Sequence, residues 1–238
     1  MSNDSVTIHE ACRNGQLAIV ESLLSTNPKL ANELDSDDRL PIHWACSFNH
    51  LDIATLLTQQ PKFDVDVQDG MGWTPLMIAC SVKEGEKLVE LLLSRGADVN
   101  AKNNSLQTAL HFIASKNNIH VARLLLDAPH KASARVRDKR GQYPLHRAAA
   151  VGATVICGLL LDHNSPINAS DNDGLTALHH AIAEGHGDTA MLLLRRGAES
   201  DKKDADGRLP IEGAPDRKVG TYILSQAKEE GIEVAMPE

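Results

Sequence analysis

The sequence repeats one seven-residue pattern at nearly constant intervals along its length. The pattern is clearest at Leu40–Cys46 (L-P-I-H-W-A-C), and it returns at Thr74–Cys80, Thr108–Ala114, Tyr143–Ala149 and Thr176–Ile182. Degenerate copies begin at positions 6 and 209, so the seven starts lie 34, 34, 34, 35, 33 and 33 residues apart. A period of this length indicates a chain of supersecondary units, each of which buries its apolar face against its neighbours.

This period, with the head T-P-L-H-x-A, is typical of ankyrin repeats, which are helix–turn–helix units. The predicted fold is therefore all-α, an ankyrin-repeat solenoid of seven helix–turn–helix repeats that forms a single domain over residues 1–238. The repeats are expected to cover residues 3–35, 36–69, 70–103, 104–138, 139–171, 172–204 and 205–238. An aromatic content of 3% suits a core of aliphatic and small side chains between closely packed helices.

Each unit is predicted to hold an inner helix, a turn and an outer helix. Proline opens several of the inner helices at their first turn, where its missing N–H costs nothing. Glycine or asparagine, which favour a left-handed helix end, follows five inner helices at Gly15, Asn49, Asn117, Gly152 and Gly185. One residue too many lies between the two helices of the third repeat, in Ser81–Glu86, so a longer turn is expected there.

The cysteines and histidines follow the same period. Cys12, Cys46 and Cys80 lie 34 residues apart in a slot that later repeats fill with alanine, which predicts buried, reduced thiols. His43 and His146 belong to a slot filled in most repeats, and a residue that recurs in this way is expected to tie its own repeat to the adjacent turn. No nucleophile is accompanied by a recognisable base and orienting partner, so neither enzymatic activity nor a cofactor or metal is expected.

The formal net charge of −8 is unevenly distributed. Residues 1–102 carry −7, residues 103–170 carry +5 and residues 171–238 carry −6, which indicates a protein-interaction surface with polarity. The acidic flanks disfavour nucleic acid as a partner. No apolar stretch approaches the length of a membrane span, and the first ten residues lack the features of a signal peptide. We therefore expect no membrane partner and a cytoplasmic and nuclear location.

Stacked helix pairs curve, and their turn tips and inner helices line the concave side, which is the usual binding face of such proteins. The candidate partner-binding residues are the turn-tip and inner-helix residues Asp37, Asp38, Arg39, Trp44, Phe48, Asp69, Met71, Trp73, Phe112, Lys116, Lys139, Arg140, Arg147 and Glu184. Four of the seven aromatic residues are among them, as expected of an apolar anchor. Trp44 and Phe112 share one repeat position, so packing between repeats is an alternative role for both.

Three phrases are more specific than an ankyrin consensus: Leu40–Cys46, Ala114–Asn117 (A-S-K-N) and His146–Ala150 (H-R-A-A-A). With these phrases and this spacing, essentially the whole chain resembles the gankyrin family of proteasome-associated ankyrin-repeat proteins. The resemblance implies an assembly chaperone of the proteasome regulatory particle. Such a protein, a monomer before it binds, holds the carboxy-terminal domain of one AAA ATPase subunit on its concave face. It thereby hinders premature docking of the ATPase ring on the proteolytic core.

The resemblance also implies which residues meet that domain. One side of the domain would face Asp37, Asp38, Arg39, Trp44, Asp69 and Trp73, and the other side would face Lys116, Lys139, Arg140 and Arg147. The mammalian member carries a Leu-x-Cys-x-Glu motif associated with retinoblastoma protein binding. This chain has His180–Glu184 there and keeps only the glutamate, so that binding is not implied.

Two other hypotheses remain open because a fold does not determine a function. One is an adaptor or inhibitor in signalling or ubiquitin ligation. The other is a hydrolase or metal enzyme that uses the histidine and cysteine slots.

Overall fold

The computed structural model describes residues 6–237, and the chain divides into two compact units, Met1–Ala109 (unit 1) and Leu110–Glu238 (unit 2). Over the described residues the chain forms thirteen α-helices and two 3-10 helices and no strand, which confirms the all-α class. The prediction that residues 1–238 form a single domain stays a prediction.

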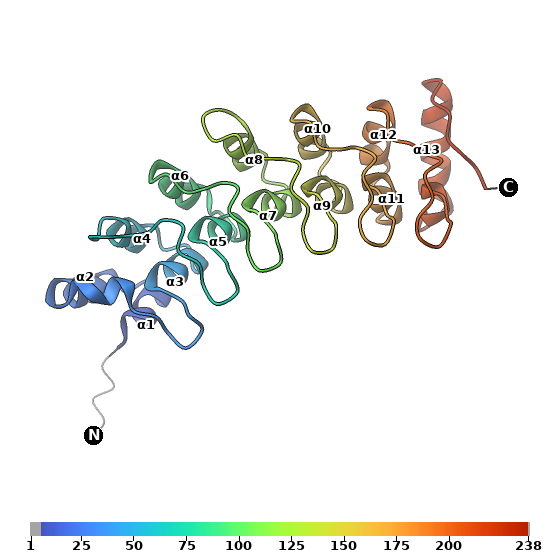
Figure 1. The fold of residues 1–238 in the computed structure, drawn as a ribbon. Coiled ribbons are helices and arrows are strands. Elements are labelled where there is room, and N and C mark those ends of the chain that lie inside the picture. Colours follow the sequence, from blue (N-terminus) through green and yellow to red (C-terminus); the bar gives the residue numbers. More distant parts are fainter. Residues whose placement is uncertain (1–5, 238) are drawn as a thin grey trace. The chain divides into compact units, whose positions relative to one another are not determined.

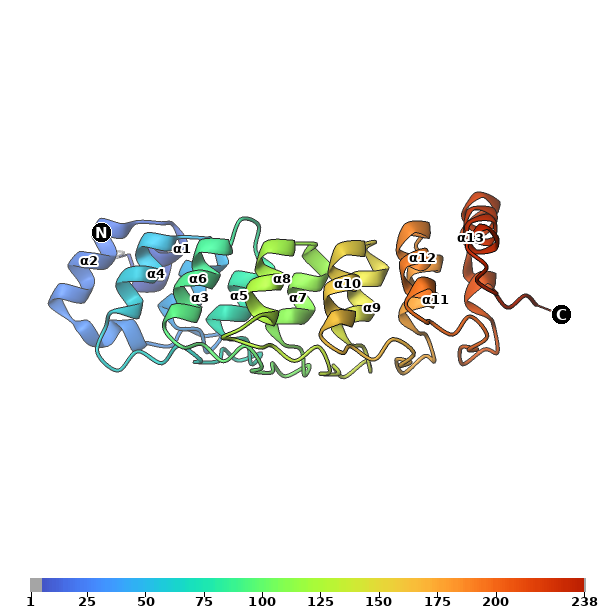
Figure 2. The same ribbon diagram turned by 90° about the horizontal axis from the view of Figure 1, so that it is seen from above.

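In unit 1 the helices form an inner row and an outer row (Figure 1). The inner row consists of α1 (Ile8–Arg13), α3 (Pro41–Ser47) and α5 (Pro75–Ser81). The outer row consists of α2 (Leu17–Thr26), α4 (Leu51–Thr58) and α6 (Glu86–Ser94), with the 3-10 helix η1 (Pro28–Asn32) after α2. Successive repeats are joined by turns that gather along one side of the unit (Figure 2).

Unit 2 has the same two rows. Its inner helices are α7 (Ala109–Lys116), α9 (Pro144–Ala150) and α11 (Ala177–Ala183), and its outer helices are α8 (Ile119–Leu126), α10 (Thr154–Asp162), α12 (Gly187–Arg195) and α13 (Arg217–Glu229). The last repeat differs from the others because its inner helix is only a 3-10 turn, η2 (Pro210–Gly213). Pro215 follows two residues later, and a proline there prevents the α-helix from continuing.

The predicted helix boundaries are confirmed. Pro41, Pro75 and Pro144 each occupy the first turn of an inner helix. The residues that follow the inner helices have left-handed backbone, with φ between 54° and 79° at Gly15, Asn49, Asn117, Gly152 and Gly185. Residues 82–85 separate α5 from α6, whereas only residues 48–50 separate α3 from α4, so the expected longer turn is present.

The core of each unit lies between its two rows of helices. Leu57 and Leu92 are fully buried on the outer helices of unit 1, as are Leu125 and Leu160 in unit 2. Each such side chain contributes about 1.5–3 kcal/mol by leaving water. Cys12, Cys46 and Cys80 are buried and form no disulfide, as predicted. Cys157 is also buried and free, and burial raises the pKa of its thiol to about 12. None of the helices in residues 6–237 combines the length and the apolar character needed to span a bilayer.

Candidate partner-binding surface

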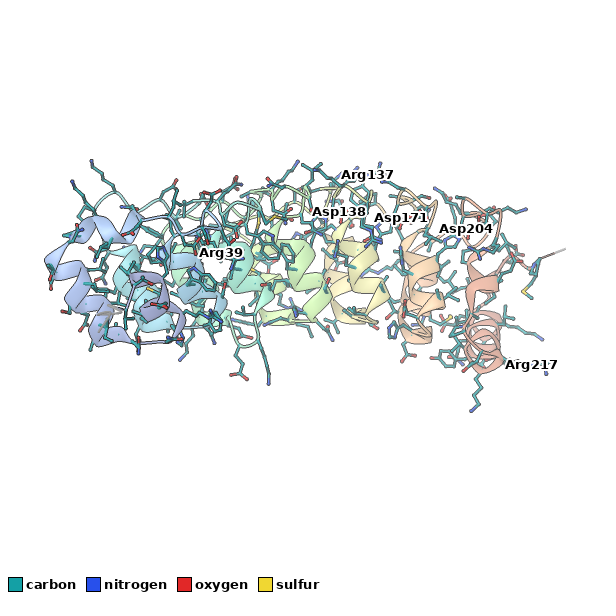
Figure 3. The ribbon with its side chains drawn as sticks, turned by 90° about the horizontal axis from the view of Figure 1, so that it is seen from below. Arg39, Arg137, Asp138, Asp171, Asp204 and Arg217 are labelled. Atoms are coloured by element: carbon teal, nitrogen blue, oxygen red, sulfur yellow. The ribbon has the colours of Figure 1, made fainter. Side chains whose placement is uncertain are left out.

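The turns that join the repeats are built around one acidic or amide side chain each. In every turn this side chain accepts the backbone N–H groups of the residues two and four positions later, over 2.8 to 3.0 Å, at Asp35, Asp69, Asn103, Asp138, Asp171 and Asp204. Three of these acids, Asp138, Asp171 and Asp204, lie in successive turns of unit 2 (Figure 3). Because short polar side chains stabilise turns in this way, the tips have defined conformations.

Neighbouring turn tips are hydrogen-bonded to one another within each unit. In unit 1 the N–H of Gly70 donates to the carbonyl of Asp37, and the N–H of Asn104 donates to the carbonyl of Met71 (3.3 and 3.1 Å). In unit 2 the N–H of Asn172 donates to the carbonyl of Arg140 (3.0 Å). The tips of each unit therefore lie side by side and present their side chains as one surface.

The histidine slot connects an inner helix to the segment that leads into the adjacent turn, as predicted. The Nδ1 atom of His43 accepts the N–H of Leu40 (3.0 Å), and Nε2 donates to the carbonyl of Val67 (3.2 Å). His146 makes the equivalent bonds with Tyr143 and Ala169, over 3.1 and 3.0 Å. Burial lowers the pKa of His146 to about 4, so its ring is neutral at neutral pH.

In unit 1 the structure brings Arg39, Trp44 and Phe48 together. The Trp44 ring is half-buried, its Nε1–H donates to Asp35 Oδ2 (2.6 Å), and its centroid lies 6.2 Å from that of Phe48. The guanidinium of Arg39 lies 5.1 Å from the Trp44 ring centroid. Phe48 is 46% exposed. These rings are therefore held in place by the chain itself and still reach the surface.

Arg13 belongs to this cluster and was not predicted from the sequence. Its guanidinium lies 5.5 Å from the centroid of Trp44 and 5.6 Å from that of Phe48. Arginine over an aromatic face is a favourable cation–π arrangement. No sequence signal indicated it, because Arg13 is about thirty residues from either ring and belongs to the degenerate first repeat.

Asp69 is not the exposed turn-tip acid that the sequence analysis expected. Its side chain is only 1% exposed, because Oδ1 accepts the N–H groups of Met71 and Trp73 and Oδ2 accepts Arg39 Nε (3.3 Å). The recurrence of an acid or amide at this turn position in six repeats is the signal that could have revealed its structural role. Asp37 and Asp38 are exposed at the tip of the preceding turn, as expected.

The remaining apolar candidates of the two units divide by exposure. Met71 is 62% exposed at its turn tip, and Trp73 is half-buried two residues later. Phe112, on α7 in unit 2, is also half-buried.

In unit 2 the cationic candidates divide in the same way. Lys116, Lys139 and Arg140 are exposed, as is Glu184 at the end of α11. Arg147 is only 21% exposed, and its Nη2 donates to Asp138 Oδ2 (2.7 Å). Arg147 is thus an inner-helix residue tied to its own turn, and the freely presented cations are the other three.

Two buried turn acids of unit 2 are strongly hydrogen-bonded. Burial alone would raise the pKa of Asp138, but the hydrogen bonds from Arg147 and the N–H of Gln142 outweigh it and lower the pKa. The same balance lowers the pKa of Asp171, where the side chains of His180 and Gln142 donate over 2.9 and 3.2 Å. Both acids are ionised at neutral pH and act as acceptors within the fold.

The described part of the chain contains no group of three or more histidine, cysteine, aspartate or glutamate side chains placed to hold a metal ion. The carboxylates of Asp171 and Asp204 each accept two N–H groups of their own turn, so these acids close the turns. Within unit 1 the turns and inner helices present aromatic and acidic groups, and within unit 2 they present basic groups.

Comparison with known proteins identifies the repeats and the relatives of this chain. A family model described as ankyrin repeats (3 copies) matches residues 8–103, 82–150 and 110–204. Over 227 residues the chain is 38% identical to the probable 26S proteasome regulatory subunit p28 of Saccharomyces cerevisiae, with 92% of this chain and 97% of that protein covered. The chain belongs to the gankyrin family of ankyrin-repeat proteins.

Another fungal relative of this gankyrin-family chain is an ankyrin repeat-containing protein of Schizosaccharomyces pombe. It is 38% identical over 218 residues, which cover 90% of this chain and 92% of the relative. Among solved structures, the human ASB11 ankyrin repeat domain superposes with a TM-score of 0.79 over 97% of this chain and 99% of that domain. Its sequence identity of 21% supports the ankyrin fold alone.

Proposed function

We propose that this gankyrin-family chain is an assembly chaperone of the proteasome regulatory particle. In this proposal it binds the carboxy-terminal domain of one AAA ATPase subunit and hinders premature docking of the ATPase ring on the proteolytic core. The observation that carries the proposal is the 38% identity to p28, a probable proteasome regulatory subunit, over nearly the full length of both chains. The chain would act by occupying a surface, without catalysis.

The charges and rings of each unit support this proposal. Unit 1 presents the exposed acids Asp37 and Asp38, which suit basic groups, and the Trp44 and Phe48 rings, which suit apolar groups. Unit 2 presents Lys116, Lys139 and Arg140, which suit acidic groups. Complementary charge of this kind speeds association and selects the partner.

Asp69 and Arg147 would support the binding surface without contacting the partner as the exposed residues do. Both side chains are committed to hydrogen bonds inside the fold, so they hold Arg39 and the Asp138 turn in position. We further propose that the protein acts in the cytoplasm and the nucleus, as a monomer before it binds.

Co-purification tests the proposal. The tagged chain, passed through yeast extract at low salt, is expected to recover free regulatory-particle ATPase subunits, identified by mass spectrometry. Recovery of signalling kinases or ubiquitin ligases without any proteasome subunit would contradict the proposal and favour an adaptor. That second candidate draws on the 33% identity over 197 residues to the probable E3 ubiquitin-protein ligase XBOS33 of Oryza sativa subsp. japonica, of which only 37% is covered.

A further inference from the structure

One turn of unit 1 carries a leucine where four of its five counterparts carry glycine. The fourth residue of each turn has left-handed backbone, and it is glycine at φ values of 77° to 81° in four turns, at Gly72, Gly141, Gly174 and Gly207. In the 35–39 turn this residue is Asp38, with φ of 55°, and a short polar side chain tolerates this region. In the 103–107 turn it is Leu106, with φ of 61°. Because the Cβ atom of an L-residue crowds the following carbonyl in this region, Leu106 is strained where glycine would not be.

The turn itself does not require the leucine side chain. The backbone N–H of Leu106 donates to the carbonyl of Asn103 (2.8 Å), and the Asn103 side chain accepts the N–H groups of Ser105 and Gln107. A glycine at position 106 would leave all three bonds in place. The leucine side chain is 42% exposed, so burial within the chain compensates for only part of the strain. A strained, bulky residue at an exposed tip suggests a role outside the fold.

Leu106 has an exposed apolar neighbour in the preceding turn. Asn104 joins the two turns, since its backbone N–H donates to the carbonyl of Met71 (3.1 Å) and its side chain donates to the carbonyl of Gly70 (3.2 Å). Met71 is 62% exposed. Two large apolar side chains therefore project from adjacent, hydrogen-bonded tips.

An acidic tip adjoins this apolar pair. The N–H of Gly70 donates to the carbonyl of Asp37. The Asp38 side chain also lies close to Gly70, since a Cβ atom added to this glycine would be 3.4 Å from a carboxylate oxygen of Asp38. Asp37 and Asp38 are both exposed. We call the four residues Asp37, Asp38, Met71 and Leu106 the tip strip.

We propose that the tip strip is a docking site for a protein segment that places an apolar side chain on Met71 and Leu106 and basic side chains on Asp37 and Asp38. Leu106 would be a specificity-determining residue of this contact. The charge of the strip favours a basic protein partner, and it disfavours an anionic lipid surface. The inference rests on the proposed function, because it describes part of the surface that the ATPase domain would meet.

Leu106→Gly separates a binding role from a structural one. Glycine relieves the backbone strain and removes the apolar side chain, so the melting temperature is expected to stay the same or rise. Affinity for the purified carboxy-terminal domain of the ATPase subunit recovered in the co-purification is expected to fall at least about fivefold by isothermal titration. Met71→Ser should weaken binding similarly at an unchanged melting temperature.

Ile19→Ser is the matched control, since Ile19 is an exposed apolar residue of unit 1 on the outer helix α2, and its affinity should equal that of the unchanged chain. Equal affinity of L106G, M71S and the unchanged chain would overturn the tip strip and leave the proposed function intact. A lower melting temperature for L106G would also overturn it, because Leu106 would then stabilise the fold. Failure of the unchanged chain to bind the domain would contradict both the tip strip and the proposed function.

Discussion

At the scale of single residues, the polar side chains of the turns act mainly on their own backbone. Asp69 and Asn103 make the same pair of hydrogen bonds with Oδ1, although one side chain is charged and the other neutral. The acceptor oxygen, rather than the charge, is therefore the feature that closes a turn. The second oxygen of the acids then positions a neighbour, such as Trp44 on Asp35 or Arg147 on Asp138.

This interpretation predicts different outcomes for two substitutions at one position. Asp69→Asn keeps the acceptor and loses only the pair with the partly exposed Arg39, so it should stay within about 1 kcal/mol of the unchanged chain. Asp69→Ala leaves the N–H groups of Met71 and Trp73 without their acceptor, and should cost about 2–3 kcal/mol. Urea unfolding measures both values, and equal stability of the two variants would contradict the described turn.

The buried histidines predict a dependence of stability on pH. Burial lowers the pKa of His111 and His146 to about 4, below the value of about 6.5 expected in the unfolded chain. Between these values the unfolded chain binds more protons than the folded chain, so stability falls as pH decreases. Between pH 7 and pH 5 we expect a loss of about 1–2 kcal/mol for each ring.

Urea midpoints at pH 7 and pH 5 check this expectation. His146→Gln, which cannot take up a proton, should lose less stability over that interval than the unchanged chain. The turn acids Asp138 and Asp171 do not contribute to the change between pH 7 and pH 5. Their lowered pKa affects stability only near and below the carboxyl pKa of the unfolded chain, about 3.9. Identical midpoints at the two pH values would contradict the neutral, buried rings.

At the scale of helices and turns, each repeat is stabilised in three ways. Outer helices bury leucines between the rows, histidines bond an inner helix to the segment that leads into the adjacent turn, and turn tips bond to one another. The turn tips bond adjacent repeats to one another, and the outer helices of adjacent repeats are in contact, so damage to one helix should weaken the repeats beside it.

Leu92→Ala in α6 tests this coupling. Leu92 is fully buried, so its truncation leaves a cavity and should cost about 2–5 kcal/mol of unfolding free energy. Hydrogen exchange should show faster exchange in the adjacent α4 as well as in α6. Leu91→Ala is the control, because Leu91 is only half-buried and should cost less. Equal losses at the two positions would be inconsistent with the described core.

Much at this scale was predictable because the local rules are strong. A proline at the first turn and a glycine or asparagine at a left-handed end predicted where α3 and α9 begin and end. The burial of Asp69 was predictable only from the recurrence of an acid or amide at this position in six turns, because the sequence does not give the individual side-chain bonds of a turn. Arg13 was missed for a related reason: its contacts with Trp44 cross from one repeat to the next.

At the scale of the whole molecule, the net charge changes sign along the chain. The chain carries −7 over residues 1–102 and +5 over residues 103–170. In unit 1 the exposed acids Asp37 and Asp38 lie on the turn tips, and in unit 2 Lys139 and Arg140 lie on a tip. A single partner that meets both units would have to carry the opposite sequence of charges.

Charge reversal tests this complementarity. The variant Lys116→Glu, Lys139→Glu, Arg140→Glu is expected to bind the ATPase domain more weakly and with less dependence on salt, because exposed charges act through screened attraction. Its melting temperature should change little, since all three side chains are exposed. The control is charge reversal at Lys83, in the turn between α5 and α6, and at Lys87, in α6. It should leave the affinity unchanged.

Isothermal titration of the purified chain with the purified carboxy-terminal domain of the recovered ATPase subunit tests the central claim most directly. The proposal predicts one domain bound per chain, with an affinity that falls as salt rises. It also predicts that the bound chain prevents the ATPase subunit from associating with the proteolytic core. Absence of binding at low salt, or binding that leaves this association unchanged, would contradict it.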